Sequence, residues 1–118
     1  MYPRLIFDLP VSLNQMYRGV SGGIVLSQAA RNWKQYAQLM ANSQWQYEPL
    51  EGELVVYCYY FGSRLDADNG TKLLFDSLNG IVWIDDSQIV EFNDYVDRKH
   101  KDNRRIEVEI HHKQGSAF

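Results

Sequence analysis

Residues 53–61, ELVVYCYYF, place the strongest constraint on the fold of this chain. The run is β-branched, aromatic and almost continuously apolar, which is typical of a strand in the middle of a sheet. We therefore expect it to occupy a central place in a sheet. Gly62-Ser63 ends the run, and the acidic residues Asp66 and Asp68 follow closely. The sequence thus predicts that these carboxylates lie on a loop leaving a central strand, where a rigid scaffold can support a site.

The other segments predict an α+β fold. They are expected to form a first strand at 2–9, a loop or loose hairpin at 14–26, a helix at 28–44, a second helix at 69–79, and strands at 91–96 and 106–111. A basic turn separates the last two strands, which are predicted to pair with each other as a hairpin. The order strand, helix, strand, helix, strand, strand indicates a mixed β-sheet with two main helices packed against it.

Length and composition favour a single domain of ordinary globular character. With 118 residues in all, we place the domain at 1–113 and a short C-terminal tail at 114–118. Cys58 is the single cysteine, which excludes an internal disulfide and a cysteine-based zinc site. The start of the chain lacks the pattern of a signal peptide, and no apolar run approaches the ~20 residues that span a membrane. These features predict a cytoplasmic protein with no membrane partner.

Both expected helices carry apolar residues at helical spacing. The first stripe contains Ala30, Trp33, Ala37, Met40 and Ala41, and the second contains Leu73, Leu74, Phe75 and Leu78. Asp68 or Asn69 is expected to cap the second helix, because a short oxygen-bearing side chain satisfies free N–H groups of the first turn. Asn79-Gly80 is expected to end it.

The acidic segment contains the ingredients of a divalent-metal site. Asp66 and Asp68 have one residue between them, and in an extended loop that spacing points both side chains the same way. Two carboxylates held together repel unless a cation lies between them, and Mg²⁺ prefers oxygen ligands. A third carboxylate, from Asp85 or Asp86, could join if the short helix folds the chain back. The alternative reading, a helix cap followed by a solvated loop, stays open.

Lys72 is a second candidate, because it follows Asp68 by one helical turn. A lysine there could offer its charge to a phosphate or to a developing anion. A surface lysine paired with Asp76 four residues later explains the same spacing equally well.

Several familiar sites are excluded by their patterns. The acidic segment lacks the glycine and the final glutamate of an EF-hand loop, and Gly22-Gly23 lacks the lysine of a P-loop. No serine lies in a nucleophile-elbow context. The three histidines, His100, His111 and His112, are not spaced as a zinc-binding set.

The formal net charge of −3 argues only weakly against a nucleic-acid partner, because the distribution of charge matters more than its sum. A basic cluster follows the expected strand at 91–96 and contains Arg98, Lys99, Lys101, Arg104 and Arg105. Such a cluster can hold phosphates beside an acidic site that holds cations. A solvated basic turn is the alternative.

Three groups of motifs, taken together, resemble one family. They are Asp66-Ala67-Asp68-Asn69 with Lys72; residues 75–80, FDSLNG; and residues 83–89, WIDDSQI. The earlier residues 10–14, PVSLN, with Tyr17-Arg18, are similar to the N-terminal signature of the same family. The sequence is thereby identified as a member of the RusA family of Holliday junction resolvases, often encoded by phages and prophages.

This resemblance implies a homodimeric endonuclease that requires Mg²⁺, or Mn²⁺ in its place, and nicks branched DNA at four-way junctions. Asp66, Asp68 and Asp86 would be the metal-binding carboxylates, with Asp85 as a further possible ligand. Asp86 is preferred to Asp85 because the family's essential residue directly precedes Ser-Gln. Lys72 matches the family's essential lysine.

Arg18, Arg31 and Lys34 would join the basic cluster in contacting the phosphates of DNA, and such contacts position a duplex without reading its sequence. Two other functions remain open for the same fold. One is a junction-binding protein without catalysis, and the other is a metal nuclease for other branched DNA or for RNA.

Overall fold

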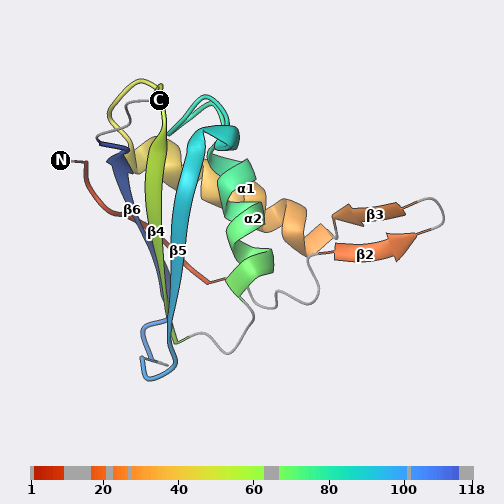
Figure 1. The fold of residues 1–118 in the computed structure, drawn as a ribbon. Coiled ribbons are helices and arrows are strands. Elements are labelled where there is room, and N and C mark those ends of the chain that lie inside the picture. The colour runs from red at the N-terminus through yellow and green to blue at the C-terminus, as the bar shows by residue number, and fades with distance from the viewer. Residues whose placement is uncertain are drawn as a thin grey trace.

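The structure is a computed structural model that describes residues 2–9, 17–20, 23–26, 28–62, 67–100 and 102–114, with backbone alone at 17–20, 23–26 and 67–70. Figure 1 shows how its elements are arranged. In chain order they are β1 (Leu5–Phe7), β2 (Tyr17–Val20), β3 (Gly23–Leu26), α1 (Gln28–Gln44), β4 (Leu54–Phe61), α2 (Ala67–Leu78), a short 3₁₀ helix η2 (Asp86–Gln88), β5 (Ile89–Asp97) and β6 (Arg105–His112).

β4 lies inside a four-stranded sheet of order β1-β6-β4-β5. It pairs with β6 in antiparallel and with β5 in parallel orientation, while β1 pairs in antiparallel orientation with β6. The mixed sheet and its two helices confirm the predicted α+β fold, and the central place expected for residues 53–61 is confirmed too. β2 and β3 form a separate antiparallel hairpin, which projects beyond the start of α1 (Figure 1).

The predicted hairpin between the last two strands is wrong, because β4 lies between β5 and β6. A connection that contains a helix can return the chain to the end of the sheet from which it left. α2 does this between β4 and β5, so these two strands run parallel. The chain then passes the end of β4, and β6 pairs with the other edge of that strand.

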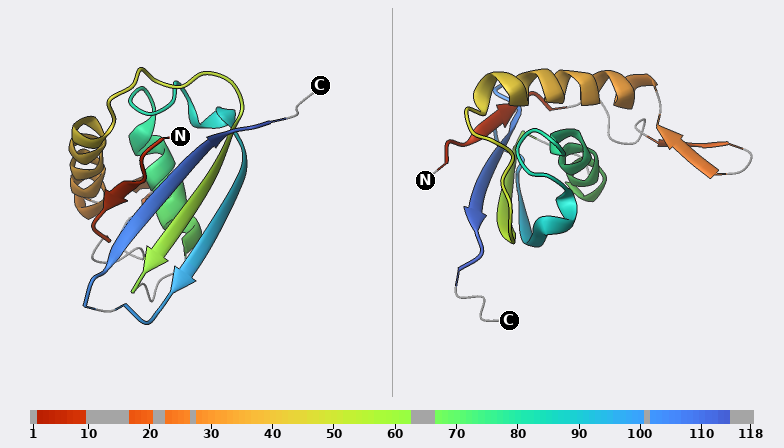
Figure 2. Two further views of the ribbon diagram at one scale, coloured as in Figure 1. Left: turned by 90° about the vertical axis from the view of Figure 1, so that its left-hand side faces the viewer. Right: turned by 90° about the horizontal axis from the view of Figure 1, so that it is seen from above.

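Both helices cover the same face of the sheet, and the opposite face is open (Figure 2). The core between the sheet and the two helices is built from alternate strand residues and from one apolar stripe of each helix. β4 contributes Leu54, Val56, Cys58 and Tyr60; β6 contributes Ile106, Val108 and Ile110; α1 contributes Ala30, Trp33, Ala37 and Ala41. The apolar stripe predicted for the first helix is therefore confirmed, with Met40 partly buried at its margin.

α2 begins at Ala67, so the expectation that Asp68 or Asn69 caps it is wrong, and both residues lie in its first turn. The short-range signal for a cap is shared by several neighbouring polar residues, and it locates a helix start to within a residue or two. Leu73, Leu74 and Leu78 are buried as predicted. The helix ends at Leu78, close to Gly80, whose φ of 81° suits a residue without a Cβ.

Across the described residues, none of the helices has the length and apolar character needed to cross a membrane.

Two glycines with positive φ allow a matched test of packing at the end of β4. A Cβ at Gly62 would clash with the carbonyl oxygen of His100 and lie 2.8 Å from Cγ of Arg104, whereas a Cβ at Gly52 would meet nothing within 4 Å. We expect Gly52→Ala to lower the free energy of unfolding by about 1 kcal/mol, the cost of a Cβ at positive φ. Gly62→Ala should cost roughly 1–3 kcal/mol more, because the site is overpacked as well. Urea unfolding of both variants measures the difference, and equal losses would contradict the crowding at Gly62.

Candidate active site

The predicted acidic site falls on α2 and on the segment that follows it. Asp68 lies in the first turn of α2 by its backbone, while its side chain and the whole of Asp66 lie outside the described residues. After α2 the chain turns back, and η2 packs beside the helix. The fold-back that a third carboxylate would need is therefore present.

Asp85 and Asp86 have different surroundings. The Asp85 carboxylate caps η2: its Oδ2 accepts a hydrogen bond from Ser87 N at 2.9 Å, and Gln88 Oε1 accepts one from Asp85 N at 2.9 Å. Hydrogen bonding from Ser87 lowers the pKa of Asp85. This capping box fixes Asp85 in a local structural contact, and it leaves the next carboxylate to face α2.

Gln88 anchors this turn to the loop before β4. Its Nε2 donates to the carbonyl oxygens of Leu50 at 2.8 Å and Gly52 at 2.9 Å. The backbone adds a further bond, from Leu50 N to Val82 O at 2.8 Å. Gln88 thus holds the turn that carries Asp85 and Asp86 in place through contacts with residues far away in the sequence.

Asp86 is half-buried and meets Asp76, which lies two turns beyond Asp68 on α2. Burial raises the pKa of Asp86, and the hydrogen bond to the Asp76 carboxyl and the charges of Asp76 and Asp85 raise it further. Two carboxyl groups in such contact favour a shared proton or a bound cation. This contact joins a carboxyl group of α2 to one of η2.

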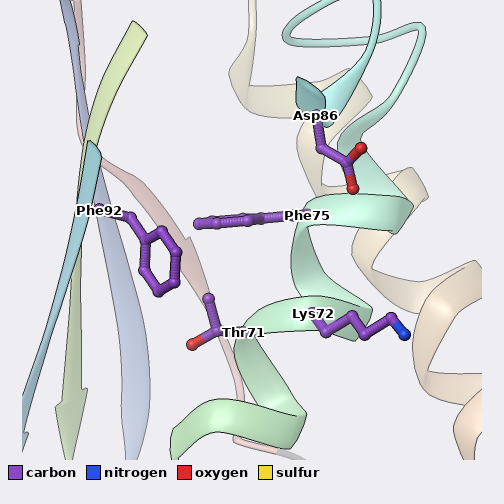
Figure 3. A pocket seen from close by; sticks show the side chains of 5 residues that line it. All are labelled: Thr71, Lys72, Phe75, Asp86 and Phe92. Carbon is purple, nitrogen blue, oxygen red and sulfur yellow. The ribbon is translucent and has the colours of Figure 1, made fainter. Parts of the chain in front are cut away.

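A pocket of about 270 Å³ lies beside this pair (Figure 3). Thr71, Lys72, Phe75, Asp86 and Phe92 line it. The rings of Phe75 and Phe92 meet edge to face with their centroids 5.6 Å apart, and Phe92 remains 52% exposed. In Figure 3, the Lys72 side chain extends across α2 on the side away from Phe92, whereas Thr71 and Phe75 point toward the sheet.

The alternative reading of Lys72 as a partner of Asp76 is not supported by contacts. Lys72 is exposed, and the ion pairs between described side chains do not join it to Asp76. No three His, Cys, Asp or Glu side chains in the described part of the chain are grouped to hold a metal ion. The carboxylates of Asp66 and Asp68 are outside that part.

The family comparison covers most of the chain: the model of the family described as Endodeoxyribonuclease RusA matches residues 8–111. The chain belongs to the RusA family. It is therefore an endonuclease of the hydrolase class, and membership implies action on Holliday junctions and, in general, dependence on a divalent metal ion. A search of curated proteins found no match.

The basic residues proposed from the sequence are distributed over several elements of this RusA domain. Arg98, Lys99 and Arg104 are exposed in the connection between β5 and β6, and Lys101 lies outside the described residues. On α1, Arg31 is exposed and Lys34 is half-buried; Arg18 lies in β2, where only the backbone is described.

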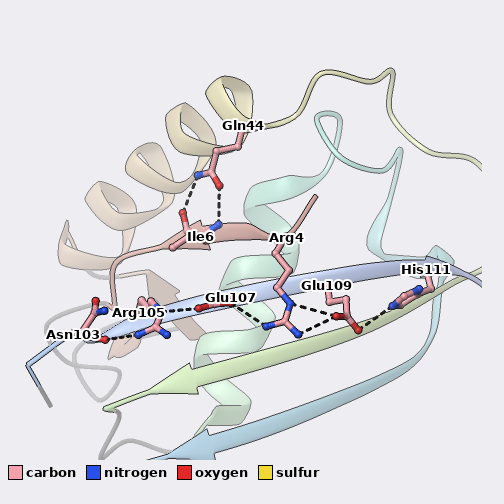
Figure 4. Close-up of polar contacts among 8 residues, drawn as sticks. All are labelled: Arg4, Ile6, Gln44, Asn103, Arg105, Glu107, Glu109 and His111. Atoms are coloured by element: carbon pink, nitrogen blue, oxygen red, sulfur yellow. Dashed lines mark hydrogen bonds and ion pairs between the residues drawn. The ribbon is translucent and has the colours of Figure 1, made fainter. Parts of the chain in front are cut away.

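Arg105 differs from its basic neighbours, because the open face of the sheet already holds its guanidinium (Figure 4). Its Nε lies 2.6 Å from Glu107 Oε2, Nη1 donates to Asn103 O at 2.9 Å, and the guanidinium carbon lies 4.1 Å from the centre of the Phe61 ring. These contacts satisfy the side chain within the protein, so its first role is to support the turn.

Two acidic residues, Asp76 within the motif FDSLNG and Asp94 beyond the motifs, were not among the site residues predicted from the sequence. Asp76 was considered only as a partner of Lys72, although the spacing of Asp68, Lys72 and Asp76 by four residues places all three along one side of a helix. Asp94 accepts a hydrogen bond from Thr71 at 2.8 Å, across 23 residues of sequence. No local sequence pattern predicts that contact.

The contact between Asp76 and Asp86 predicts an unusual response to charge removal in metal-free protein. Because the pKa of Asp86 is raised by folding, the native state binds its proton more tightly than the unfolded state does. Stability should therefore fall as pH rises above the usual carboxyl range. We expect Asp76→Asn to raise the free energy of unfolding at neutral pH by up to about 1 kcal/mol, the usual limit where water screens the charges.

Thermal unfolding in EDTA at pH 7.5 and at pH 3.5 measures this gain, which should vanish at the lower pH. Glu51→Gln, an exposed carboxylate on a loop, serves as the control. A loss of stability in Asp76→Asn at both pH values would contradict the repulsion.

Proposed function

We propose that this RusA protein is a Mg²⁺-dependent, structure-selective endodeoxyribonuclease that resolves four-way DNA junctions by paired phosphodiester hydrolysis. The observation that carries the proposal is the contact between the Asp86 and Asp76 carboxyl groups, beside an exposed Lys72 on the same helix. Family membership supplies the class of reaction and the branched substrate.

The donor set fits a hard divalent cation. Asp86 and Asp76 bring carboxyl oxygens together at a half-buried position, where mutual repulsion favours a cation between them or beside them. Asp66, Asp68 and Asp86 would hold the ion, and Asp76 would orient Asp86 or share in the coordination. Asp85 is a weaker candidate, because its carboxylate already caps η2. A bound divalent ion supplies a more acidic water and stabilises negative charge on the phosphate.

Lys72 would act on the phosphate itself. It lies one turn after Asp68 and one turn before Asp76, and its side chain is exposed. An ammonium group there can neutralise a non-bridging oxygen as negative charge develops during the in-line displacement. The chain's own carboxylates would hold and orient the attacking water.

The basic residues would position the DNA arms. Arg98, Lys99 and Arg104 lie in the connection between β5 and β6, and Lys101 falls between them in the sequence. Arg31 and Lys34 lie on α1, and Arg18 lies in β2. Contacts of this kind carry no base information, which suits an enzyme that selects structure. Arg105 would contribute less, because Glu107 and Phe61 already engage it.

A two-fold homodimer would complete the arrangement. A four-way junction can present two equivalent strands, so two related active sites could cut them symmetrically. Each subunit would make one nick by the same reaction, and the two-fold symmetry of the dimer would place the two nicks symmetrically.

Carboxylate variants test the assignment of the site. We expect Asp68→Asn and Asp86→Asn to lower the rate of nicking of a labelled four-way junction by at least about a hundredfold, while leaving junction affinity within a few-fold, because metal-site groups serve the chemical step. Glu51→Gln should cut like the parent. Single-turnover assays with Mg²⁺ at fixed salt measure the rates, and electrophoretic shifts in Ca²⁺ measure affinity. An active Asp68→Asn would overturn the site, and a parent that binds without nicking would overturn the catalytic proposal.

The basic residues in the connection between β5 and β6 give an independent prediction about DNA binding. We expect Lys99→Ala and Arg104→Ala each to weaken binding on junctions of different sequence by similar factors and to reduce the slope of log K against log salt by roughly 1. Lys113→Ala, just beyond the far end of β6, should leave the slope unchanged. Salt titrations of binding provide the slopes, and an unchanged slope in Arg104→Ala would remove that residue from the interface.

A further inference from the structure

We infer that Thr71, held by Tyr60 and Asp94, is a positioning residue for the catalytic groups on α2. This inference rests on the proposed function, because it concerns how Lys72 and the carboxylates of that site are kept in place. It assigns a role to a buried polar network that the RusA motifs do not include.

The network is a directed chain of hydrogen bonds between the sheet and the helix. Thr71 Oγ1 donates to Asp94 Oδ2 at 2.8 Å, and it is also hydrogen-bonded to the hydroxyl of Tyr60. A hydroxyl has one proton to give, so the Tyr60 hydroxyl is the donor in the second bond. The chain therefore runs from β4 through α2 to β5.

Two members of the network are buried in the core, and the third, Asp94, is half-buried. Tyr60 is 1% exposed and Thr71 is 3% exposed. Asp94 stands opposite Cys58 in the parallel register of β4 and β5. Burial raises the pKa of the Cys58 thiol, and the charge of Asp94 and a hydrogen bond to it raise this pKa further. Hydrogen bonds to a carboxylate in such surroundings are stronger than their equivalents in water.

Most other contacts of α2 with the sheet are apolar. Leu73, Leu74 and Leu78 attach the helix firmly, but apolar burial is non-directional and tolerates small shifts of one surface over another. The bond from Thr71 to Asp94 has a required direction and length, so it fixes the rotation and the height of the helix.

Thr71 is well placed to transmit this constraint to the site. It precedes Lys72 in the chain and lines the same pocket as Lys72 and Asp86. Asp68 lies one turn before it on the helix backbone. A small rotation of α2 would move Lys72 and Asp76 relative to Asp86, which the η2 turn holds separately through Gln88. Catalysis is sensitive to displacements of this kind.

Thr71→Val tests the role, because valine keeps the shape and removes the hydroxyl. We expect the rate of junction nicking at saturating DNA to fall by about ten- to a hundredfold, the range for residues that orient metal ligands. Junction affinity should stay within about twofold of the parent, because positioning groups need not contact the DNA. Thr71→Ser keeps the hydroxyl and should restore most of the rate.

Ser77→Ala is the matched control. Ser77 is also a fully buried hydroxyl on α2, but its Oγ donates to Leu73 O within the helix, at 2.7 Å, and makes no bond to the sheet. Each assay is run at a temperature where every variant is folded. Tyr60→Phe removes the other link of the network, and it provides the test if Thr71→Val does not fold.

Hydrogen exchange of the backbone amides at 71–78 gives a readout that does not depend on activity. In metal-free protein we expect faster exchange in Thr71→Val than in Ser77→Ala. Equal exchange, or equal loss of activity in the two variants, overturns the inference, because general helix stability would then explain both. A parent that nicks junctions beside an equally active Thr71→Val overturns the inference alone. A parent that never nicks overturns the proposed function and this inference with it.

Discussion

Burial of β4 is the constraint on which the rest of the structure depends. The strand has hydrogen-bonded neighbours on both edges, and alternate residues from Leu54 to Tyr60 are removed from water beneath the helices. Each such side chain contributes ~1.5–3 kcal/mol. Because β4 needs a cover, α2 must cross its face, and the first turn of that helix carries Asp68. Two of the residues proposed for catalysis, Asp68 and Lys72, thus lie on the helix that closes the core.

Local patterns predicted the elements well and their partners less well. The helix at 28–44 and the strand at 53–61 follow from periodicity and composition over long windows, and the structure agrees with both. The expected pairing of β5 with β6 failed because proximity in sequence competed with the deeper burial that β6 gains beside β4. For the site, the motifs located Asp86 and Lys72 near one pocket. The contacts of Asp76 and of Asp94 arise only when distant segments pack, so no short window contains them.

Carboxylates on the two sides of the sheet are treated in opposite ways. On the open face, Arg4 lies 3.0 Å from both Glu107 and Glu109, and burial of Glu107 is outweighed by its arginine partners, which lower the pKa of that carboxyl (Figure 4). Near the pocket, Asp86 meets another carboxyl, and its pKa is raised. Arginine neutralises Glu107 and Glu109 within the fold, whereas the carboxyl groups of Asp86 and Asp76 face each other. Carboxyl groups whose pKa is perturbed in the second way are typical of functional sites.

A pair of hydrogen bonds from a helix side chain covers part of the edge strand β1. Gln44, the last residue of α1, accepts a hydrogen bond from Ile6 N at 2.7 Å and donates one to Ile6 O at 2.8 Å (Figure 4). A side-chain amide offers a donor and an acceptor as a peptide group does, so one glutamine takes the place of a neighbouring strand. An exposed strand margin is a template for pairing with other chains. The helix therefore closes that margin at Ile6, and growth of the sheet by added strands is directed toward β5.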